Sequence, residues 1–156
     1  MQTLDALISA SPVFAGLAAG DLALIAGCAS HEHVNPGTYL LHEGDPADRF
    51  YLIRHGRVAL EARAPGRGTI VIETLRPGEL LGWSWLFAPH RWQLDARALE
   101  PCSLIGFDGL CLRNKCEADS RLGYQLMSRF ASDMLTRLQA ARFQLLDVYG
   151  NVPEQR

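Results

Sequence analysis

Residues 36–58 read PGTYLLHEGDPADRFYLIRHGRV, and this stretch decides the fold. Gly37, Gly44 and Gly56 stand between short apolar runs, where a tight turn needs a backbone conformation that glycine adopts without steric cost. The run at residues 50–53, FYLI, is mostly aromatic or β-branched, as strands usually are. The stretch therefore predicts antiparallel strands joined by tight turns.

Short apolar runs and turn signals alternate on both sides of this stretch, from His33 to Asp108. Residues 69–72, TIVI, are β-branched, and residues 58–62, VALEA, alternate apolar with polar or small side chains. The turn signals are NPG at 35–37, EGDP at 43–46, HG at 55–56, PG at 65–66, PG at 77–78 and EP at 100–101. Short strands at such regular spacing predict a sandwich or a barrel.

Helical patterns flank the predicted strands. The predicted helices cover Leu4–Ser9, Asp21–Cys28, Gly109–Glu117 and a long segment from Asp119 to about Tyr149. Asp21, Asp108 and Asp119 are good N-caps for the last three of them. Gly150 and Pro153 stop the long helix.

The long helix carries an apolar seam whose spacing alternates four and three. Its members are Met127, Ala131, Met134, Leu138, Ala141, Leu145 and Val148. This heptad spacing is typical of a helix that packs on a partner helix, so it predicts a homodimer through this helix. Phe130, Phe143 and Leu146 widen the stripe, which leaves open the alternative that the helix packs on its own β-domain.

Composition indicates one globular domain. The chain has 156 residues, 48% of them hydrophobic and 21% charged, and its formal net charge is −2. A chain of about 150 residues can bury roughly 70% of its unfolded surface, so it does not need disulfides or a structural metal to fold. The charge balance gives no overall positive field for nucleic acid or an anionic membrane.

The first residues, MQTLDALISASPVFAGLAAG, lack a basic leader, and Asp5 interrupts their apolar run. They predict neither a signal peptide nor a membrane span, and a cytoplasmic location is expected. The four cysteines are Cys28, Cys102, Cys111 and Cys116, and they form no C-x-x-C pair. Reduced thiols are therefore expected, with Cys111 and Cys116 packing as ordinary apolar side chains.

The ordered set of motifs from Gly37 through Glu43-Gly44-Asp45, Asp48 and the aromatic strand to Gly56-x-Val58 resembles the cyclic nucleotide-binding domain family, of the Crp/Fnr-like kind. The resemblance extends from about Leu4 to Tyr149. It implies a double-stranded β-roll, jelly-roll-like and mainly β, with about eight antiparallel strands, N-terminal helices and a long C-terminal helix. The expected organisation is a β-roll domain with a hinge helix at 1–117, a dimerisation helix at 118–150 and a tail at 151–156.

In that family a cassette between two late strands holds the ligand, and here it opens at residues 77–82, PGELLG. The family pattern places a Glu for the ribose hydroxyl, an Arg for the cyclic phosphate and then a small hydroxyl residue. Trp83, Trp92 and Gln93 stand at those positions. The residues of the predicted cassette are Leu81, Gly82, Trp83, Ser84, Trp85, Arg91, Trp92 and Gln93. An indole offers one N–H donor and no charge, so binding of cyclic AMP or cyclic GMP is expected to be lost or altered.

Three alternatives stay open for this cassette. A short helix over residues 83–87 would offer backbone amides and Ser84 to an anion, beside aromatic faces that stack a planar ligand. Trp83 and Trp92 would instead fill the cavity themselves. Arg91 would rescue cyclic nucleotide binding if the loop register slipped by one residue.

Other residue clusters give weaker indications. Cys28, His31, His33 and His42 lie close in sequence, but they lack the second pair of a zinc site, so surface histidines rather than a metal or cupin-like site are expected. No sequence motif of a catalytic nucleophile, a phosphate loop or a zinc protease is present, and an enzyme is not expected. Asp95 and Arg97 are expected to be strand residues or a surface pair.

The sequence thus predicts a non-enzymatic sensing or regulatory module, without cofactor or metal, whose diverged cassette takes a cyclic nucleotide or another planar or anionic small molecule. One alternative is a ligand-free structural dimer that acts through a protein partner. Transcription factors of the family place a helix-turn-helix after the long helix, and no residues remain for one. Arg129, Arg137 and Arg142 do not form a convincing DNA face, so direct nucleic-acid binding is not expected unless the chain is truncated.

Overall fold

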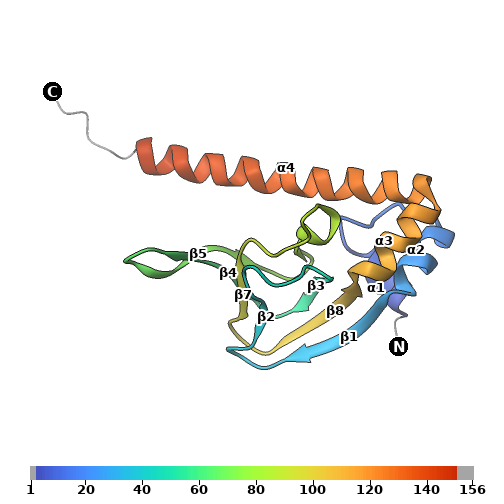
Figure 1. Ribbon diagram of the computed structural model, residues 1–156, viewed down its shortest axis with the longest axis horizontal. Helices are drawn as coiled ribbons and strands as arrows, with labels where there is room; N and C mark the ends of the chain where they lie inside the picture. Colours follow the sequence, from blue (N-terminus) through green and yellow to red (C-terminus); the bar gives the residue numbers. More distant parts are fainter. Residues whose placement is uncertain (1–2, 151–156) are drawn as a thin grey trace.

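The eight strands form two antiparallel sheets of four in the computed structural model, which describes residues 3–150 (Figure 1). The strand orders are β1-β8-β3-β6 and β2-β7-β4-β5. The elements are α1 (Leu4–Ser9), α2 (Ala19–Ala26), β1 (Ala29–Val34), β2 (Tyr39–Leu41), β3 (Arg49–His55), β4 (Val58–Ala64), β5 (Gly68–Leu75), β6 (Leu80–Leu81), the 3-10 turn η1 (Ser84–Leu86), β7 (Asp95–Ala98), β8 (Cys102–Asp108), α3 (Gly109–Ala118) and α4 (Ser120–Gly150). The predicted double-stranded β-roll with flanking helices is confirmed.

The glycine turns of residues 36–58 have the backbone that their sequence predicts. Gly37, Gly44 and Gly56 have φ angles of 84°, 89° and 91°. A Cβ atom on Gly56 would lie 2.6 Å from both the Cys102 Sγ and the Pro101 carbonyl oxygen. Glycine is therefore required at this position by sterics as well as by backbone conformation.

Two apolar clusters hold the roll together. One lies between the two sheets and includes Leu41, Leu81 and Trp92. The other lies between the first sheet and the helices, where the Phe50 ring stacks on Phe107 with centroids 4.4 Å apart. The second cluster attaches the helices to the roll.

Helix α2 begins at Ala19, two residues before the predicted N-cap Asp21. The prediction was wrong because Asp21 has another partner: its side chain, only 4% exposed, accepts hydrogen bonds from Arg121 Nη1 at 2.9 Å and Nη2 at 2.6 Å. The pair joins α2 to the first turn of α4. Strand β1 also starts earlier than predicted, at Ala29 rather than His33, because the whole segment pairs with β8.

The predictions for α3 and the start of α4 are confirmed. Asp108 accepts a hydrogen bond from the Cys111 amide at 3.0 Å and caps α3. Asp119 Oδ1 accepts from the amides of Arg121 at 3.1 Å and Leu122 at 3.2 Å. Within the described residues α4 extends to Gly150, whereas Pro153 and the tail at 151–156 lie outside them.

Helix α4 buries its first half and exposes its second. Leu122, Leu126 and Phe130 are fully buried against the roll. Farther along, α4 runs above the β4–β5 hairpin (Figure 1), and both Phe143 and Leu146 are exposed. Packing on the β-domain therefore explains the apolar side chains in the first half of α4 only. The predicted seam has Met134 half-buried and its other members exposed in a single chain, and it stays a prediction.

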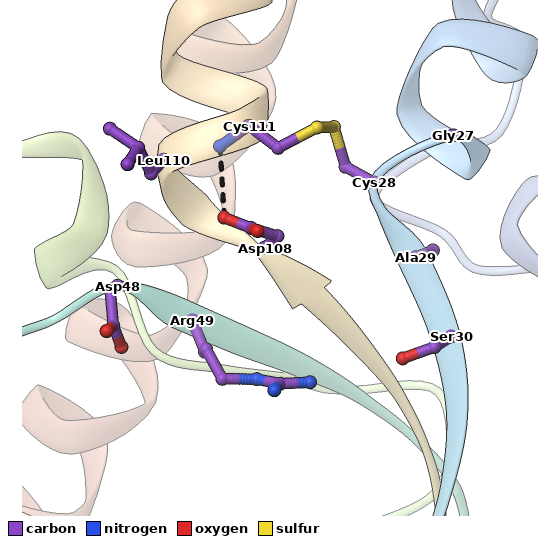
Figure 2. A pocket seen from close by; sticks show the side chains of 9 residues that line it. All are labelled: Gly27, Cys28, Ala29, Ser30, Asp48, Arg49, Asp108, Leu110 and Cys111. Atoms are coloured by element: carbon purple, nitrogen blue, oxygen red, sulfur yellow. Dashed lines mark hydrogen bonds between the residues drawn. A yellow bond between two sulfur atoms is a disulfide. The ribbon is translucent and has the colours of Figure 1, made fainter.

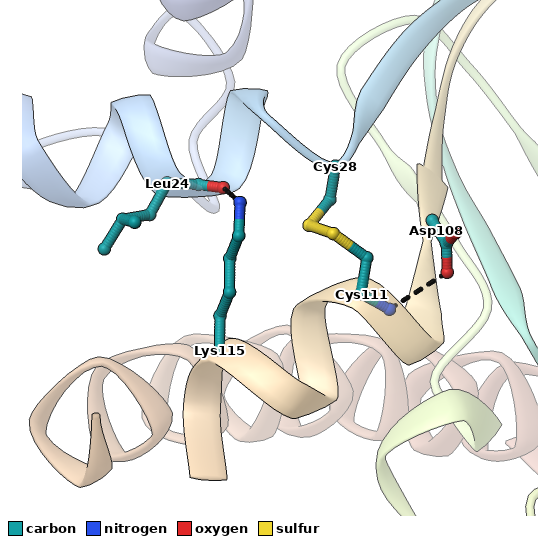
Figure 3. The surroundings of a disulfide bond; sticks show 5 residues. All are labelled: Leu24, Cys28, Asp108, Cys111 and Lys115. Carbon is teal, nitrogen blue, oxygen red and sulfur yellow. Dashed lines mark hydrogen bonds between the residues drawn. A yellow bond between two sulfur atoms is a disulfide. The ribbon is translucent and has the colours of Figure 1, made fainter. Parts of the chain in front are cut away.

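Cys28 and Cys111 form a disulfide, so the expectation of four reduced thiols, with Cys111 among them, was wrong (Figure 3). The two residues are separated by 83 positions, and their Cα atoms are 5.9 Å apart. The antiparallel pairing of β1 with β8 places Ala29 opposite Phe107, which brings the start of β1 to the start of α3. Sequence spacing does not reveal this proximity. Cys102 and Cys116 are free thiols.

Among residues 3–150, no helix combines the length and the hydrophobicity of a membrane span.

Candidate functional site

Trp92 fills part of the roll interior next to the cassette turn. Gly82 follows β6 with a φ of 103°, and a Cβ atom there would lie 2.7 Å from the Trp92 Cη2 and Cζ3 atoms. Trp92 is 6% exposed and packs in the cluster between the sheets. Its amide donates to the Asp45 carbonyl at 3.1 Å and its carbonyl accepts from the Gly44 amide at 2.9 Å. The Glu-Gly-Asp turn therefore fixes the position of this indole.

Trp83 connects the cassette to α4. Its indole Nε1–H donates to Asp133 Oδ2 at 3.0 Å, and the Arg137 guanidinium lies over its ring, 4.6 Å from the centroid. Arg137 Nη2 in turn donates to the Leu80 carbonyl. The backbone of β6, Trp83 and two turns of α4 thus form one contact network, which we call the cassette–helix latch.

A cavity of about 250 Å³ lies beside this latch. It is lined by Leu41, Leu60, Leu81, Gly82, Trp83, Ser84, Trp92, Gln93, Leu94 and Arg137. Its walls are mainly apolar, and Arg137 is the one charged residue among those that line it. A site of this kind favours a small, largely apolar molecule with few polar groups.

Arg137 is a buried cation that shares its surroundings with two carboxylates. Its side chain is 10% exposed, and its Nε lies 3.7 Å from both Glu73 Oε1 and Asp133 Oδ2. Within residues 3–150 this Nε has no hydrogen-bond partner. Burial raises the pKa of Glu73, an effect that the Arg137 charge opposes and the nearby Glu79 and Asp133 reinforce. The two acids offset the positive charge that Arg137 brings to the cavity.

Six of the eight predicted cassette residues line the cavity, and two do not. Trp85 is fully buried on the other side of the first sheet, where it stacks on Phe50 at 4.6 Å. Arg91 is exposed, and its Nη1 donates to the Gly44 carbonyl at 2.9 Å. This geometry gives no support to a rescue of phosphate binding by Arg91.

The short helix predicted over residues 83–87 is a 3-10 turn over Ser84–Leu86. The macrodipole of a helix is the sum of many aligned peptide dipoles, and a single turn provides little of it. The prediction of an anion site at this helix start is therefore not supported by the structure.

Sequence reasoning missed four lining residues: Leu41, Leu60, Leu94 and Arg137. The leucines are recognisable as strand or loop residues but not as neighbours of the cassette, because only strand pairing brings them there. Arg137 sits next to the predicted seam residue Leu138. Its burial depends on how α4 crosses the roll, which no local pattern encodes.

Asp95 and Arg97 are strand residues, but they do not pair with each other. Asp95 is buried and accepts from the Glu43 amide at 2.7 Å, with Arg63 Nε 3.6 Å from its other oxygen. Arg97 Nε donates to Glu61 at 2.6 Å. Because β7 lies between β2 and β4, each side chain finds its partner on a neighbouring strand or loop.

His31, His33 and His42 are exposed, as predicted. His33 Nδ1 lies 2.9 Å from Ser103 Oγ, and His42 stacks on Tyr39. Within the part of the chain that the structure describes, no three His, Cys, Asp or Glu side chains come together in a way that could hold a metal ion.

Comparison with known proteins identifies the class to which this fold belongs. The family model of the cyclic nucleotide-binding domain matches residues 31–119. A CRP-like cAMP-activated global transcriptional regulator of Mycobacterium tuberculosis is 23% identical over 153 residues, which cover 97% of this chain and 68% of the regulator. The chain therefore belongs to the cyclic nucleotide-binding domain family.

Solved structures show the same architecture. A protein of Geobacter metallireducens described as cyclic nucleotide-binding superposes with a TM-score of 0.79 and 28% identity, over 88% of this chain and 99% of that one. The catabolite activator protein of Thermus thermophilus gives a TM-score of 0.70 at 24% identity, over 90% of this chain and 63% of that one. The chain is thus built on the cyclic nucleotide-binding fold.

Proposed function

We propose that this chain is a non-enzymatic, ligand-responsive regulatory module whose cassette has diverged from cyclic nucleotides. The observation that carries the proposal is the placement of the two indoles. Trp92 packs against Gly82 inside the roll, and Trp83 bonds to α4, at the positions where the family pattern has its Arg and Glu. A cyclic phosphate needs a compensating cation, and neither indole supplies one.

The cavity supports a particular class of ligand. Its leucines and the Trp92 indole favour a small planar molecule, and the Arg137 side chain, which lines the cavity, offers a guanidinium donor to an acceptor on that molecule. A stacked aromatic contact is worth about 1–3 kcal/mol. Glu73 and Asp133 stand beside Arg137 and oppose a strongly anionic ligand. We therefore favour a compact heteroaromatic molecule with a single acceptor or carboxylate.

The cassette–helix latch supplies the route by which such a ligand acts. Trp83 and Arg137 line the cavity and also hold α4. A ligand that accepts a hydrogen bond from Arg137 competes with the latch contacts and changes the position of α4. The exposed seam of α4, centred on Leu138, then transmits the change to a second copy of the chain or to a regulated protein partner.

Calorimetric titration tests the proposal, with cyclic AMP, cyclic GMP, a cyclic dinucleotide, benzoate and indole-3-acetate as probes. We expect no micromolar saturation by the cyclic nucleotides and saturable binding of at least one aromatic acid. Leu60→Trp fills the cavity and should abolish that binding. Ile70→Trp adds the same indole to the exposed face of β5 and should leave it unchanged. Micromolar saturation by cyclic AMP contradicts the proposal.

A second candidate is a ligand-free structural dimer that acts through a protein partner. The self-filling position of Trp92 favours it, because tryptophan contributes a large buried apolar surface wherever it fills a cavity. In that case none of the probes binds to the unmodified chain. Trp92→Ala, which removes the indole from the cavity, should create binding of benzoate.

A further inference from the structure

The disulfide between Cys28 and Cys111 ties the junction of α2 and β1 to the first turn of α3 (Figures 2 and 3). The same junction is held by two hydrogen bonds. The Asp108 amide donates to the Cys28 carbonyl at 2.8 Å, and Lys115 Nζ donates to the Leu24 carbonyl at 2.6 Å. The covalent bond is therefore one of three ties between α2 and the α3 segment.

Helix α3 connects the cassette with the long helix. Arg113 Nη1 donates to the Trp85 carbonyl in η1 at 2.6 Å, and the Gly109 amide donates to the Asp48 carbonyl at 2.7 Å. At its other end α3 leads into α4 through the Asp119 cap. A change that fixes or releases the start of α3 therefore acts on the element that lies between the cassette and α4.

The two disulfide-bonded residues border an open cavity. Both cysteines line an open cavity of about 520 Å³, which Figure 2 shows between β1, β3 and the start of α3. Cys28 is buried, whereas Cys111 is partly exposed. Exchange rates depend on access to the attacked sulfur, so we take Cys111, the more exposed of the two residues, as the one that a small thiolate attacks first.

The bond is not needed to staple an insufficient core. Two clusters of buried side chains already hold the roll and the helices, and a chain of about 150 residues is large enough to fold without disulfides. The chain also keeps Cys102 and Cys116 as free thiols, unlike a disulfide scaffold in which cysteines are paired throughout. A single accessible disulfide at a helix junction fits a regulatory bond better than a structural one.

We propose that Cys28–Cys111 is a reversible thiol–disulfide exchange site for small thiols of the glutathione type, and that its reduction releases the start of α3. The thiolate of the first small thiol attacks Cys111 Sγ, the protein disulfide breaks, and Cys28 leaves as a thiolate that takes up a proton. A second small thiol attacks the mixed disulfide and releases Cys111. Two small thiols are oxidised to one disulfide while the protein gains two thiols, and the reverse reaction restores the bond.

The test uses the purified chain in glutathione buffers of increasing reduced fraction. Maleimide labelling after denaturation counts the thiols, and mass-resolved hydrogen exchange follows α3. We expect two labelled cysteines in the oxidised chain and all four in the reduced one. Amides of α3 should exchange roughly tenfold faster after reduction, because local opening then needs less free energy.

Variants separate this disulfide from the remaining cysteines. Cys28→Ser and Cys111→Ser should show the fast α3 exchange in oxidised and in reduced glutathione alike. Cys102→Ser and Cys116→Ser should respond to glutathione like the unmodified chain. If the two cysteines stay thiols in oxidised glutathione, the proposal is wrong. It is equally wrong if millimolar reduced glutathione leaves the bond intact in the folded chain, or if reduction leaves α3 exchange unchanged. These measurements on the unmodified chain do not depend on the variants or on any cassette ligand.

Discussion

The indole Nε1 of Trp83 lies 3.0 Å from Asp133 Oδ2, so a side chain of the cassette turn is hydrogen-bonded to the middle of α4. Asp133 is 18% exposed, and hydrogen bonds to charged groups in such partly buried places stabilise by more than neutral ones. A double-mutant cycle of Trp83→Phe and Asp133→Ala should therefore give a coupling energy of roughly 1–2 kcal/mol in the free energy of unfolding. Urea unfolding of the four chains measures it.

Hydrogen exchange adds a structural readout to that cycle. Trp83→Phe keeps an aromatic ring under Arg137 but removes the indole N–H donor, so exchange should rise in the part of α4 that faces the cassette. Residues 120–130, which pack on the roll through other contacts, serve as the internal control. Additive single effects, with a coupling energy near zero, contradict the latch.

The contact between Gly82 and Trp92 predicts a steric penalty. Gly82→Ala places a Cβ atom 2.7 Å from a rigid indole and also requires a φ of 103°, so the free energy of unfolding should fall by roughly 2–4 kcal/mol. Gly66→Ala is the matched control, because Gly66 has a φ of 75° and open space around it. It should lose only the backbone component, roughly 1–2 kcal/mol. Equal losses in thermal unfolding of the two variants would show that Trp92 does not press on Gly82.

The Cys28–Cys111 bond joins two residues that are 83 positions apart in the sequence, so it strongly restricts the conformations of the unfolded chain. Its reduction should lower the free energy of unfolding by roughly 2–4 kcal/mol. For a chain of this size that corresponds to a fall in Tm of about 5–15 °C. Calorimetry with and without a reductant measures the shift, and Cys28→Ser should lack it. A reductant-dependent shift that persists in Cys28→Ser would assign the effect to another group.

Arg121 hydrogen-bonds to Asp21 and holds the pKa of that carboxyl below its usual value, against an opposing contribution from burial. A carboxyl whose pKa is lowered by folding stabilises the protein above its unfolded pKa, near 4, and loses that contribution as the pH falls further. The Tm difference between the unmodified chain and Asp21→Asn should therefore shrink between about pH 4 and pH 2. Thermal unfolding across that range measures it, with Asp5→Asn on α1 as the exposed control. A difference that stays constant with pH contradicts this role.

The exposed seam of α4 predicts self-association. Leu138 is 48% exposed and Leu145 is 57% exposed in a single chain, although both occupy heptad positions. Leu138→Glu places a charge in the predicted seam and should yield a monomer in sedimentation experiments. Gln139→Glu, on an exposed neighbouring position, should leave the mass unchanged. If neither variant changes the sedimentation mass, the predicted coiled-coil dimer is wrong.

Local patterns predicted the strands well because each strand is short and bounded by a turn with its own chemistry. The glycines at 37, 44 and 56 have the positive φ that their turns need, and Asp108 and Asp119 cap the helices as expected. Asp21 was misassigned because its partner, Arg121, lies 100 positions away in sequence. A capping rule considers only the next few residues, and a buried ion pair overrides it.

The candidate site could be predicted only in part for the same reason. Trp83 and Trp92 were recognised by their positions in the motif, but the direction of each indole is set by neighbours from other elements. Trp85, two residues after Trp83, points to the opposite side and stacks on Phe50. Arg137 reaches the cavity only because α4 crosses the roll there.

The sequence by itself determined the short strands, their turns and the helix boundaries near Asp108 and Asp119. These features depend on residues that are close in sequence and on the intrinsic conformations of glycine, aspartate and β-branched side chains. The tertiary structure alone decided that Cys28 bonds to Cys111, that Asp21 pairs with Arg121 and that Trp83 holds α4. Each of these contacts joins segments that strand pairing or helix packing brings together, and the resulting burial and geometry cannot be read from spacing along the chain.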